Sequence, residues 1–346
     1  MGETSLMDVP FWLWAAVVVT FLALMAVDLF IVDRNPHVVT TAEAGRWVTF
    51  YIALAVAFGI GIWVFYGGQY GGEFFAGWIT EYSLSIDNLF VFVIIMSTFA
   101  VPEVHQHRVL LIGILIALIM RAGFIAIGAA AIASFQWIFY VFGTFLIYTA
   151  YKLATHREEE EFKENAVLRG VKKVLPVTED YRGAKLFIKE NGKRFATPML
   201  IVMVAIGTTD LLFALDSIPA IFGLTQEPFL VFTANAFALM GLRQLYFLIG
   251  GLLSKLVYLS VGLSVVLGFI GVKLIFEAME GSGIEWVPHF ETFVSLGIIV
   301  SVLAVTTIAS LLKVRRDPSA AKHVPAAKAE TIRAGQAEAN APERDS

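Results

Sequence analysis

The chain contains no cysteine among its 346 residues. Disulfide scaffolds, thiolate metal sites and redox dithiols are therefore excluded. Charged residues are also scarce, at 16%, whereas hydrophobic residues make up 58% and the mean hydropathy is +0.75. A soluble protein of this length needs more polar surface than that, so the composition indicates a bundle of membrane-spanning helices.

Other motifs that would suggest a different class of protein are missing as well. The six histidines fall in expected loops or at span ends, which disfavours a buried zinc site. The start, MGETSLMDVP, lacks a basic n-region, so no cleavable signal is expected. The sequence has no nucleophile–base pair, phosphate loop or HExxH motif, so we expect neither an enzyme nor a resident cofactor, and no nucleic-acid partner.

Long apolar runs predict the fold class. A helix needs about 20 apolar residues to cross the hydrocarbon core of a bilayer. Nine segments qualify and predict an all-α polytopic membrane bundle: residues 10–32, 47–66, 74–100, 109–133, 135–153, 198–222, 229–250, 256–278 and 290–312. The fourth and fifth spans meet near Ser134 with almost no loop, which predicts a tight hairpin there.

The distribution of Lys and Arg predicts the orientation, because short cytoplasmic loops retain positive charge. One set of connections carries basic residues, including ten between 155 and 197. The opposite set (1–9, 67–73, around 134, 223–228 and 279–289) carries no Lys or Arg. We therefore expect a multi-pass protein of the inner (plasma) membrane, with its N-terminus outside and its C-terminus in the cytoplasm.

The third and sixth spans carry similar acidic motifs. Each has an acid, five further residues, then Asp and a small polar residue: Glu81-Tyr-Ser-Leu-Ser-Ile-Asp87-Asn88 and Asp210-Leu-Leu-Phe-Ala-Leu-Asp216-Ser217. The acids are 129 residues apart in both cases, and two basic pairs follow at 122 and 121 residues, Arg121 with Arg243 and Lys152 with Lys273. Two blocks of three spans thus share one plan.

Three spans are an odd number, so the second block runs opposite to the first. Secondary transporters with such inverted repeats bind their substrates near the midplane between the repeats. The sequence accordingly divides into peripheral spans (1–72), a first repeat (73–154), a cytoplasmic loop (155–197), a second repeat (198–280), the ninth span (281–316) and a disordered cytoplasmic tail (317–346). We expect the 155–197 loop to be a solvated connector with some helix.

Four carboxylates inside spans are costly, at about 2.5–3.5 kcal/mol each on insertion scales. Their oxygen donors suit Mn²⁺, Mg²⁺ or Ca²⁺. The candidate metal ligands are Glu81, Asp87, Asn88, Asp210, Asp216 and Ser217. Arg121 and Arg243 are candidate counter-ions or gating residues, Asp28, Thr209 and Asn235 are candidate pathway residues, and Lys152 and Lys273 are expected to snorkel to the membrane surface.

Spacing leaves two arrangements of the acids open. Residues six apart on an ideal helix point about 240° away from each other. Glu81 and Asp87 therefore meet at one ion only if the helix unwinds between them, and the same holds for Asp210 and Asp216. Otherwise one acid of each pair binds the ion while the other pairs with arginine or carries a proton.

Several motifs resemble the TerC family of integral membrane proteins, particularly its Alx-like branch. They are Asp28–Arg34 (DLFIVDR), Glu81–Val93 (EYSLSIDNLFVFV), Gln106–Arg121 (QHRVLLIGILIALIMR), Phe142–Leu153 (FGTFLIYTAYKL), Asp216–Phe222 (DSIPAIF) and Phe232–Phe247 (FTANAFALMGLRQLYF). The resemblance implies a role in metal homeostasis, with manganese export or tellurite resistance, and a relation to the LysE-type superfamily of inverted-repeat exporters. The family's acidic motif positions fall on Glu81, Asp87, Asn88, Asp210, Asp216 and Ser217.

Two functions follow as hypotheses. The first is alternating-access export of a divalent cation, Mn²⁺ before others, with protons as a candidate coupled ion. The second is a membrane platform that loads metal into secreted enzymes or organises a tellurite or metal stress-response complex with other proteins.

Overall fold

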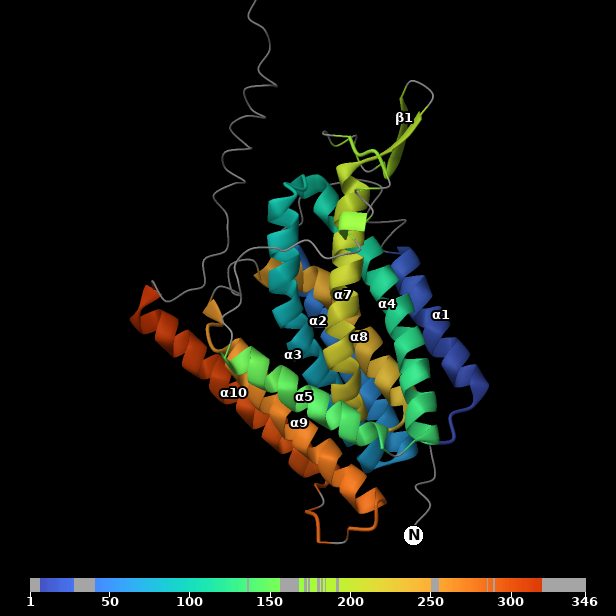
Figure 1. The fold of residues 1–346 in the computed structure, drawn as a ribbon, viewed down its shortest axis with the longest axis vertical. Coiled ribbons are helices and arrows are strands. Elements are labelled where there is room, and N and C mark those ends of the chain that lie inside the picture. The colour runs from blue at the N-terminus through green and yellow to red at the C-terminus, as the bar shows by residue number, and fades with distance from the viewer. Residues whose placement is uncertain are drawn as a thin grey trace, which may run out of the picture.

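The computed structural model describes residues 7–27, 41–135, 137–155, 168–170, 173, 175–178, 181, 183, 185–190, 193–249, 255–284, 286–288 and 290–318. Within these residues the chain is almost entirely helical (Figure 1). The helices are α1 (Phe11–Val27), α2 (Thr41–Tyr66), α3 (Gly68–Thr98), α4 (Glu103–Ser134), α5 (Ile138–Thr155), α7 (Pro198–Phe222), α8 (Pro228–Ile249), α9 (Leu259–Gly281) and α10 (Thr292–Arg316). The strands are β1 (Phe187–Glu190) and β2 (Lys193–Ala196).

Each of the expected spans coincides with one helix. Seven of the described helices are long and apolar enough to cross a membrane by length and composition: α2, α3, α4, α5, α7, α9 and α10. α1 has 17 described residues, and α8 is not among the seven. The all-α polytopic class is confirmed, with seven membrane-length helices where the sequence predicted nine.

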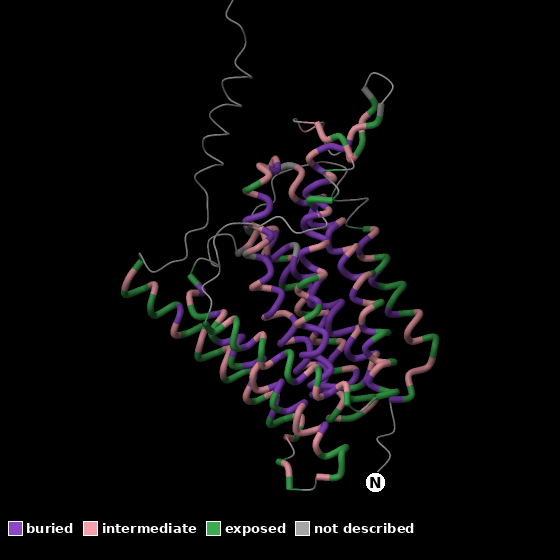
Figure 2. Tube along the Cα trace, in the orientation of Figure 1, coloured by how far each residue is buried: buried purple, intermediate pink, exposed green. Residues whose placement is uncertain are grey.

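The helices form an upright group and an inclined group (Figure 1). α3, α7 and α8 pack together with α2 and α4, and α5, α9 and α10 run obliquely along one flank. Buried positions concentrate in the upright group, whereas α10 is mostly exposed (Figure 2). Large apolar side chains remain exposed on the outer helices, such as Val64 on α2 and Val305 on α10, as lipid-facing surfaces require.

The junction between α2 and α3 depends on one glycine. Gly67 alone separates the two helices and has a φ of 104°, which L side chains rarely adopt. α4 ends at Ser134 and α5 begins at Ile138, so their connection is short, but the two helices do not form the expected hairpin. α5 then leaves α4 and packs mainly along α9.

The crossing of α5 and α9 is held close by two glycines. A Cβ atom on Gly143 would lie 2.7 Å from the Gly271 carbonyl oxygen, and one on Gly271 would lie 2.9 Å from the Gly143 carbonyl oxygen. Each glycine also faces an isoleucine of the other helix, Ile275 or Ile147. This close approach is typical of small residues at helix contacts in membranes.

Two expectations about polar segments need correction. The 155–197 connector contains the β1–β2 hairpin, and Tyr181 donates a hydrogen bond to the Phe99 carbonyl oxygen at the end of α3, at 2.7 Å. Burial raises the pKa of Tyr181 to about 12, so this donor keeps its proton. Lys273 does not snorkel to the surface: it is buried, and its Nζ lies 3.6 Å from Glu277 Oε1.

We predict that Gly143→Ala lowers the stability of the bundle by about 1–3 kcal/mol, because the added methyl group meets the α9 backbone. Thermal unfolding in detergent, followed by size-exclusion chromatography, measures the effect. Gly123→Ala on α4 is the matched control, since a Cβ there meets no atom within 4 Å. Equal unfolding temperatures for the two variants would show that the crossing tolerates a side chain.

Candidate functional site

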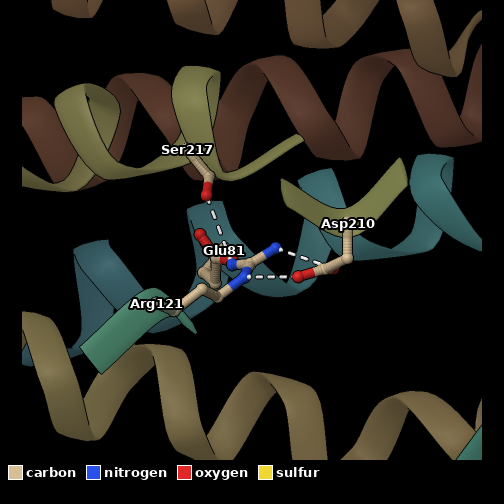
Figure 3. Close-up of polar contacts among 4 residues, drawn as sticks. All are labelled: Glu81, Arg121, Asp210 and Ser217. Carbon is tan, nitrogen blue, oxygen red and sulfur yellow. Dashed lines mark hydrogen bonds and ion pairs between the residues drawn. The ribbon is translucent and has the colours of Figure 1, made fainter. Parts of the chain in front are cut away.

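Four polar side chains meet inside the bundle, where α3, α4 and α7 approach one another (Figure 3). Arg121 of α4 forms an ion pair with Glu81 of α3. Its Nε and Nη2 donate hydrogen bonds to the Asp210 carboxylate of α7, at 3.2 and 3.3 Å. Its Nη1 donates to Ser217 Oγ at 3.2 Å. We call these four residues the Arg121 cluster.

The Arg121 cluster is sealed from solvent. The exposed fractions are 0% for Glu81, 1% for Arg121 and 2% for Asp210. Each of the three residues lies near the middle of a membrane-length helix. A buried charge is tolerated only when opposite charge and hydrogen bonds compensate it, so the guanidinium is required where two carboxylates converge. Two carboxylates and one guanidinium leave a formal charge of −1.

The second acid of the α7 motif lies elsewhere. Asp216 is half-buried, and its Oδ1 accepts a hydrogen bond from Thr149 of α5 at 3.1 Å. Lys152, one turn further along α5, attracts Asp216 electrostatically. Asp216 is therefore directed to α5 and not to Arg121.

The acidic motif of α3 is likewise spread along an unbroken helix. α3 and α7 remain helical through Glu81–Asp87 and through Asp210–Asp216. Asp87 is half-buried and Asn88 is buried. The unwinding that would bring both acids of a motif to one ion is absent from α3 and α7, and the first acid of each motif, Glu81 or Asp210, pairs with Arg121.

The six candidate metal ligands are thus not assembled into one site. Within the described part of the chain, no three His, Asp or Glu side chains gather closely enough to hold a metal ion. Glu81, Asp210 and Ser217 meet, but around a guanidinium. Arg121 lies between the two carboxylates and compensates their charge.

The remaining candidates differ in how they are placed. Asp28 and the side chain of Arg243 lie outside the described part of the structure. Thr209 is buried beside Asp210 in sequence. Asn235 of α8 is 1% exposed, and its amide nitrogen and oxygen have no hydrogen-bond partner among the described residues.

Sequence reasoning missed a second polar cluster, which lies at the N-terminal end of α3. Thr225 donates a hydrogen bond to Glu73 Oε2 at 2.6 Å, and Gln69 donates one to Glu73 Oε1 at 3.1 Å. Glu227 accepts a hydrogen bond from the Met7 backbone N–H at 3.0 Å. We call Gln69, Glu73, Thr225 and Glu227 the Glu73 cluster. It was overlooked because the third span was expected to begin at residue 74, which left Glu73 in a loop.

The environment of Glu227 favours its protonated form. Burial raises the pKa of this carboxyl above its ordinary value, and the nearby Glu73 carboxylate adds to the shift. The hydrogen bond from Met7 acts in the opposite direction. Thr149 was missed as well, although it lies in a motif quoted above, because a lone threonine in an apolar span gives no signal of its partner.

The apolar helices and the sealed charge cluster define a multi-pass integral membrane protein. Residues 66–318 match the family model described as "Integral membrane protein TerC family". The chain belongs to the TerC family.

Several bacterial proteins are similar to this chain over most of their length. The chain is 46% identical over 315 residues to an uncharacterized membrane protein of Mycobacterium tuberculosis, covering 87% of this chain and 79% of the relative. An uncharacterized membrane protein of Myxococcus xanthus is 42% identical over 314 residues, covering 90% and 96%. The Escherichia coli protein named "Putative membrane-bound redox modulator Alx" is 34% identical over 307 residues, covering 86% and 93%. No solved structure matches the chain.

We predict that Arg121→Gln lowers the free energy of unfolding by about 3–5 kcal/mol, because Glu81 and Asp210 lose their shared counter-ion. The triple variant Glu81→Gln/Arg121→Gln/Asp210→Asn should regain most of this loss, since it leaves no charge in the Arg121 cluster. Unfolding temperatures in detergent test both statements. An Arg121→Gln protein as stable as the triple variant would mean that Glu81 and Asp210 cost no stability when they lack their counter-ion.

Proposed function

We propose that the protein exports a divalent metal cation, Mn²⁺ before others, by alternating access at the Arg121 cluster. The proposal rests on one observation: Glu81 and Asp210, one from each acidic motif, meet at Arg121 in a cluster buried near the middle of the bundle. Ionisable residues inside a membrane mark ion pathways by default, since their burial is otherwise unfavourable.

In this proposal the positive charge of Arg121 takes the place of the transported cation when the site is empty. In the arrangement described here, the guanidinium lies between the two carboxylates and compensates them when no cation does. A divalent ion would take over these oxygens, with Ser217 Oγ as a further donor, once Arg121 has moved aside. Carboxylate and hydroxyl oxygens are hard donors suited to Mn²⁺, Mg²⁺ or Ca²⁺. Mn²⁺ comes first because the resemblance to the Alx-like branch implies manganese export.

An inverted repeat would supply the two access states, and the packing is consistent with one. α3 packs on α8 as α4 packs on α7, and α5 packs on α9 through reciprocal glycine contacts. Gly143 and Gly271 are 128 residues apart, close to the 129 that separates Glu81 from Asp210. Lys152 and Lys273 are 121 residues apart and do not follow this spacing. In this proposal Asp87, Asn88 and Asp216 line the pathway on either side of the central site.

A membrane platform for metal loading or stress-response complexes is the second candidate. The β1–β2 hairpin favours it, because Lys189 and Arg194 are exposed on a segment that leaves the bundle (Figure 1). The name of the Escherichia coli relative attributes redox modulation to that protein. The present chain has no cysteine, so any redox role here would not use a thiol. Transport by the purified protein separates the two candidates.

We predict that the purified chain in liposomes moves Mn²⁺ down a concentration gradient, and that Glu81→Gln or Asp210→Asn reduces the initial rate at least tenfold. The control is Asp317→Asn, an exposed carboxylate at the end of α10 whose Oδ2 lies 3.7 Å from Lys313 Nζ. The inhibition of Mn²⁺ flux by added Mg²⁺ or Ca²⁺ ranks the preference of the site among the three ions. A wild-type protein without cation flux, under conditions where it is folded, would exclude the exporter.

Export also requires the orientation proposed from the Lys and Arg distribution. The absence of cysteine makes every introduced thiol a unique label. We predict that, in intact cells, a membrane-impermeant maleimide labels Ser282→Cys in the α9–α10 connection, whereas Lys189→Cys in β1 reacts only after the membrane is opened. The reverse pattern would invert the direction of transport.

A further inference from the structure

One buried side chain of α8 lacks a partner for both of its polar groups. Asn235 is 1% exposed, and neither its amide nitrogen nor its carbonyl oxygen has a hydrogen-bond partner among the described residues. The buried hydroxyls of Thr80, Ser85 and Ser295 are unpartnered as well, but each of them is a single rotatable group. A carboxamide buries a strong acceptor together with its donors, so leaving it unpaired is more costly.

The level of Asn235 in the bundle follows from the contacts between α3 and α8. A Cβ atom on Gly77 would lie 3.5 Å from Ala234 Cβ, and one on Gly241 would lie 3.1 Å from the Tyr82 ring. The two helices therefore run parallel, with Ala234 beside Gly77 and Gly241 beside Tyr82. Asn235, the residue after Ala234, is then about 5 Å along the axis from the level at which α3 contributes its acid to the Arg121 cluster.

The direction of Asn235 follows from a contact between α8 and α4. Tyr246 of α8 donates a hydrogen bond to Gln106 of α4 at 3.1 Å. Asn235 and Tyr246 are 11 residues apart, which is three helical turns to within about 20°. Both side chains therefore project from the face of α8 that packs against α4.

The same contact places Asn235 close to the level of Arg121. α4 runs antiparallel to α8, because α8 is parallel to α3 and α4 returns from α3 after a short connection. Arg121 lies 15 residues after Gln106, and Asn235 lies 11 residues before Tyr246. These lengths of helix are about 22 Å and about 16 Å, so the two residues are offset by about one turn. Two separate registers thus place the unpaired carboxamide beside the Arg121 cluster.

The Arg121 cluster by itself is a sparse ligand set for a hard divalent cation. Mn²⁺, Mg²⁺ and Ca²⁺ take about six or more oxygen ligands. The cluster offers two carboxylates and the Ser217 hydroxyl. The carbonyl oxygen of an asparagine is a ligand of the same hard type, and it adds a donor without adding negative charge.

We propose that Asn235 is a further ligand of the transported cation, with Oδ1 coordinated to the ion between Glu81 and Asp210 once Arg121 has moved aside. The inference rests on the proposed export function and deepens it by assigning another residue to the cation site. While the guanidinium occupies the cluster, the carboxamide stays unpaired. A bound ion pairs its oxygen, so the cation removes a cost that the empty protein carries.

The test measures the unfolding temperature of the full chain in detergent at increasing Mn²⁺ concentration. A ligand that binds the folded protein raises this temperature, and the concentration dependence of the shift reports its affinity. Asn235→Leu, which removes both polar groups at similar volume, should raise the half-saturating Mn²⁺ concentration at least tenfold. The same increase is expected in the half-saturating concentration for Mn²⁺ flux into liposomes.

Ser295→Ala is the matched control. Its hydroxyl is also buried without a partner, but it lies at the start of α10, which packs on α3 and α9. This variant should respond to Mn²⁺ within twofold of the wild type. A loss of Mn²⁺ response as large as that of Asn235→Leu would mean that any buried polar deletion disturbs the site, and would overturn the assignment of Asn235.

Asn235→Asp tests the same position in the opposite direction. It keeps an oxygen there and adds a negative charge, so Mn²⁺ should raise its unfolding temperature by more than it raises that of the wild type. This variant decides the matter if Asn235→Leu does not fold. A smaller shift than in the wild type would overturn the inference, because a carboxylate at a ligand position strengthens the binding of a divalent ion.

The outcomes separate the two proposals. An unchanged Mn²⁺ response in Asn235→Leu overturns the ligand and leaves the exporter standing. Absence of both a Mn²⁺-dependent shift and Mn²⁺ flux in the wild type overturns export itself, and the ligand with it.

Discussion

The structure depends on one electrostatic constraint: two carboxylates are buried in an apolar bundle and share a single guanidinium. Arg121 reaches Glu81 on α3 and Asp210 on α7 from the middle of α4. Two consecutive helices, α3 and α4, and the distant α7 are therefore fixed in relative position by charge as well as by packing. An apolar contact tolerates small shifts, whereas a buried ion pair loses its compensation when its partners separate.

In the proposed exporter, the same constraint would allow the site to release a bound cation. A carboxylate pair that always bound a cation tightly would retain it, and one without compensation would destabilise the empty protein. A guanidinium within reach of both acids offers a third state, in which the site is empty of cargo and still nearly neutral.

The two ends of the bundle are built differently. At the start of α3, the Glu73 cluster gathers side chains from α3 and the α7–α8 connection with the Met7 backbone. At the opposite end, Tyr181 ties the hairpin segment to the end of α3 through the Phe99 carbonyl oxygen. α3 is thus held by polar contacts at both ends and in its middle, while most of its other contacts are apolar. Any movement of α3 relative to its neighbours would have to break these three sets of polar contacts and replace them with others.

The sequence by itself determined the helical class, the positions of the spans and the acidic motifs, because about 20 apolar residues and an isolated carboxylate are local signals that need no partner. It did not determine which acids meet. Glu81 and Asp210, the first acid of each motif, both reach Arg121, whereas Asp216 accepts a hydrogen bond from Thr149 of α5. Gln69, Glu73, Thr225 and Glu227 come from distant segments, so only the tertiary structure brought them together.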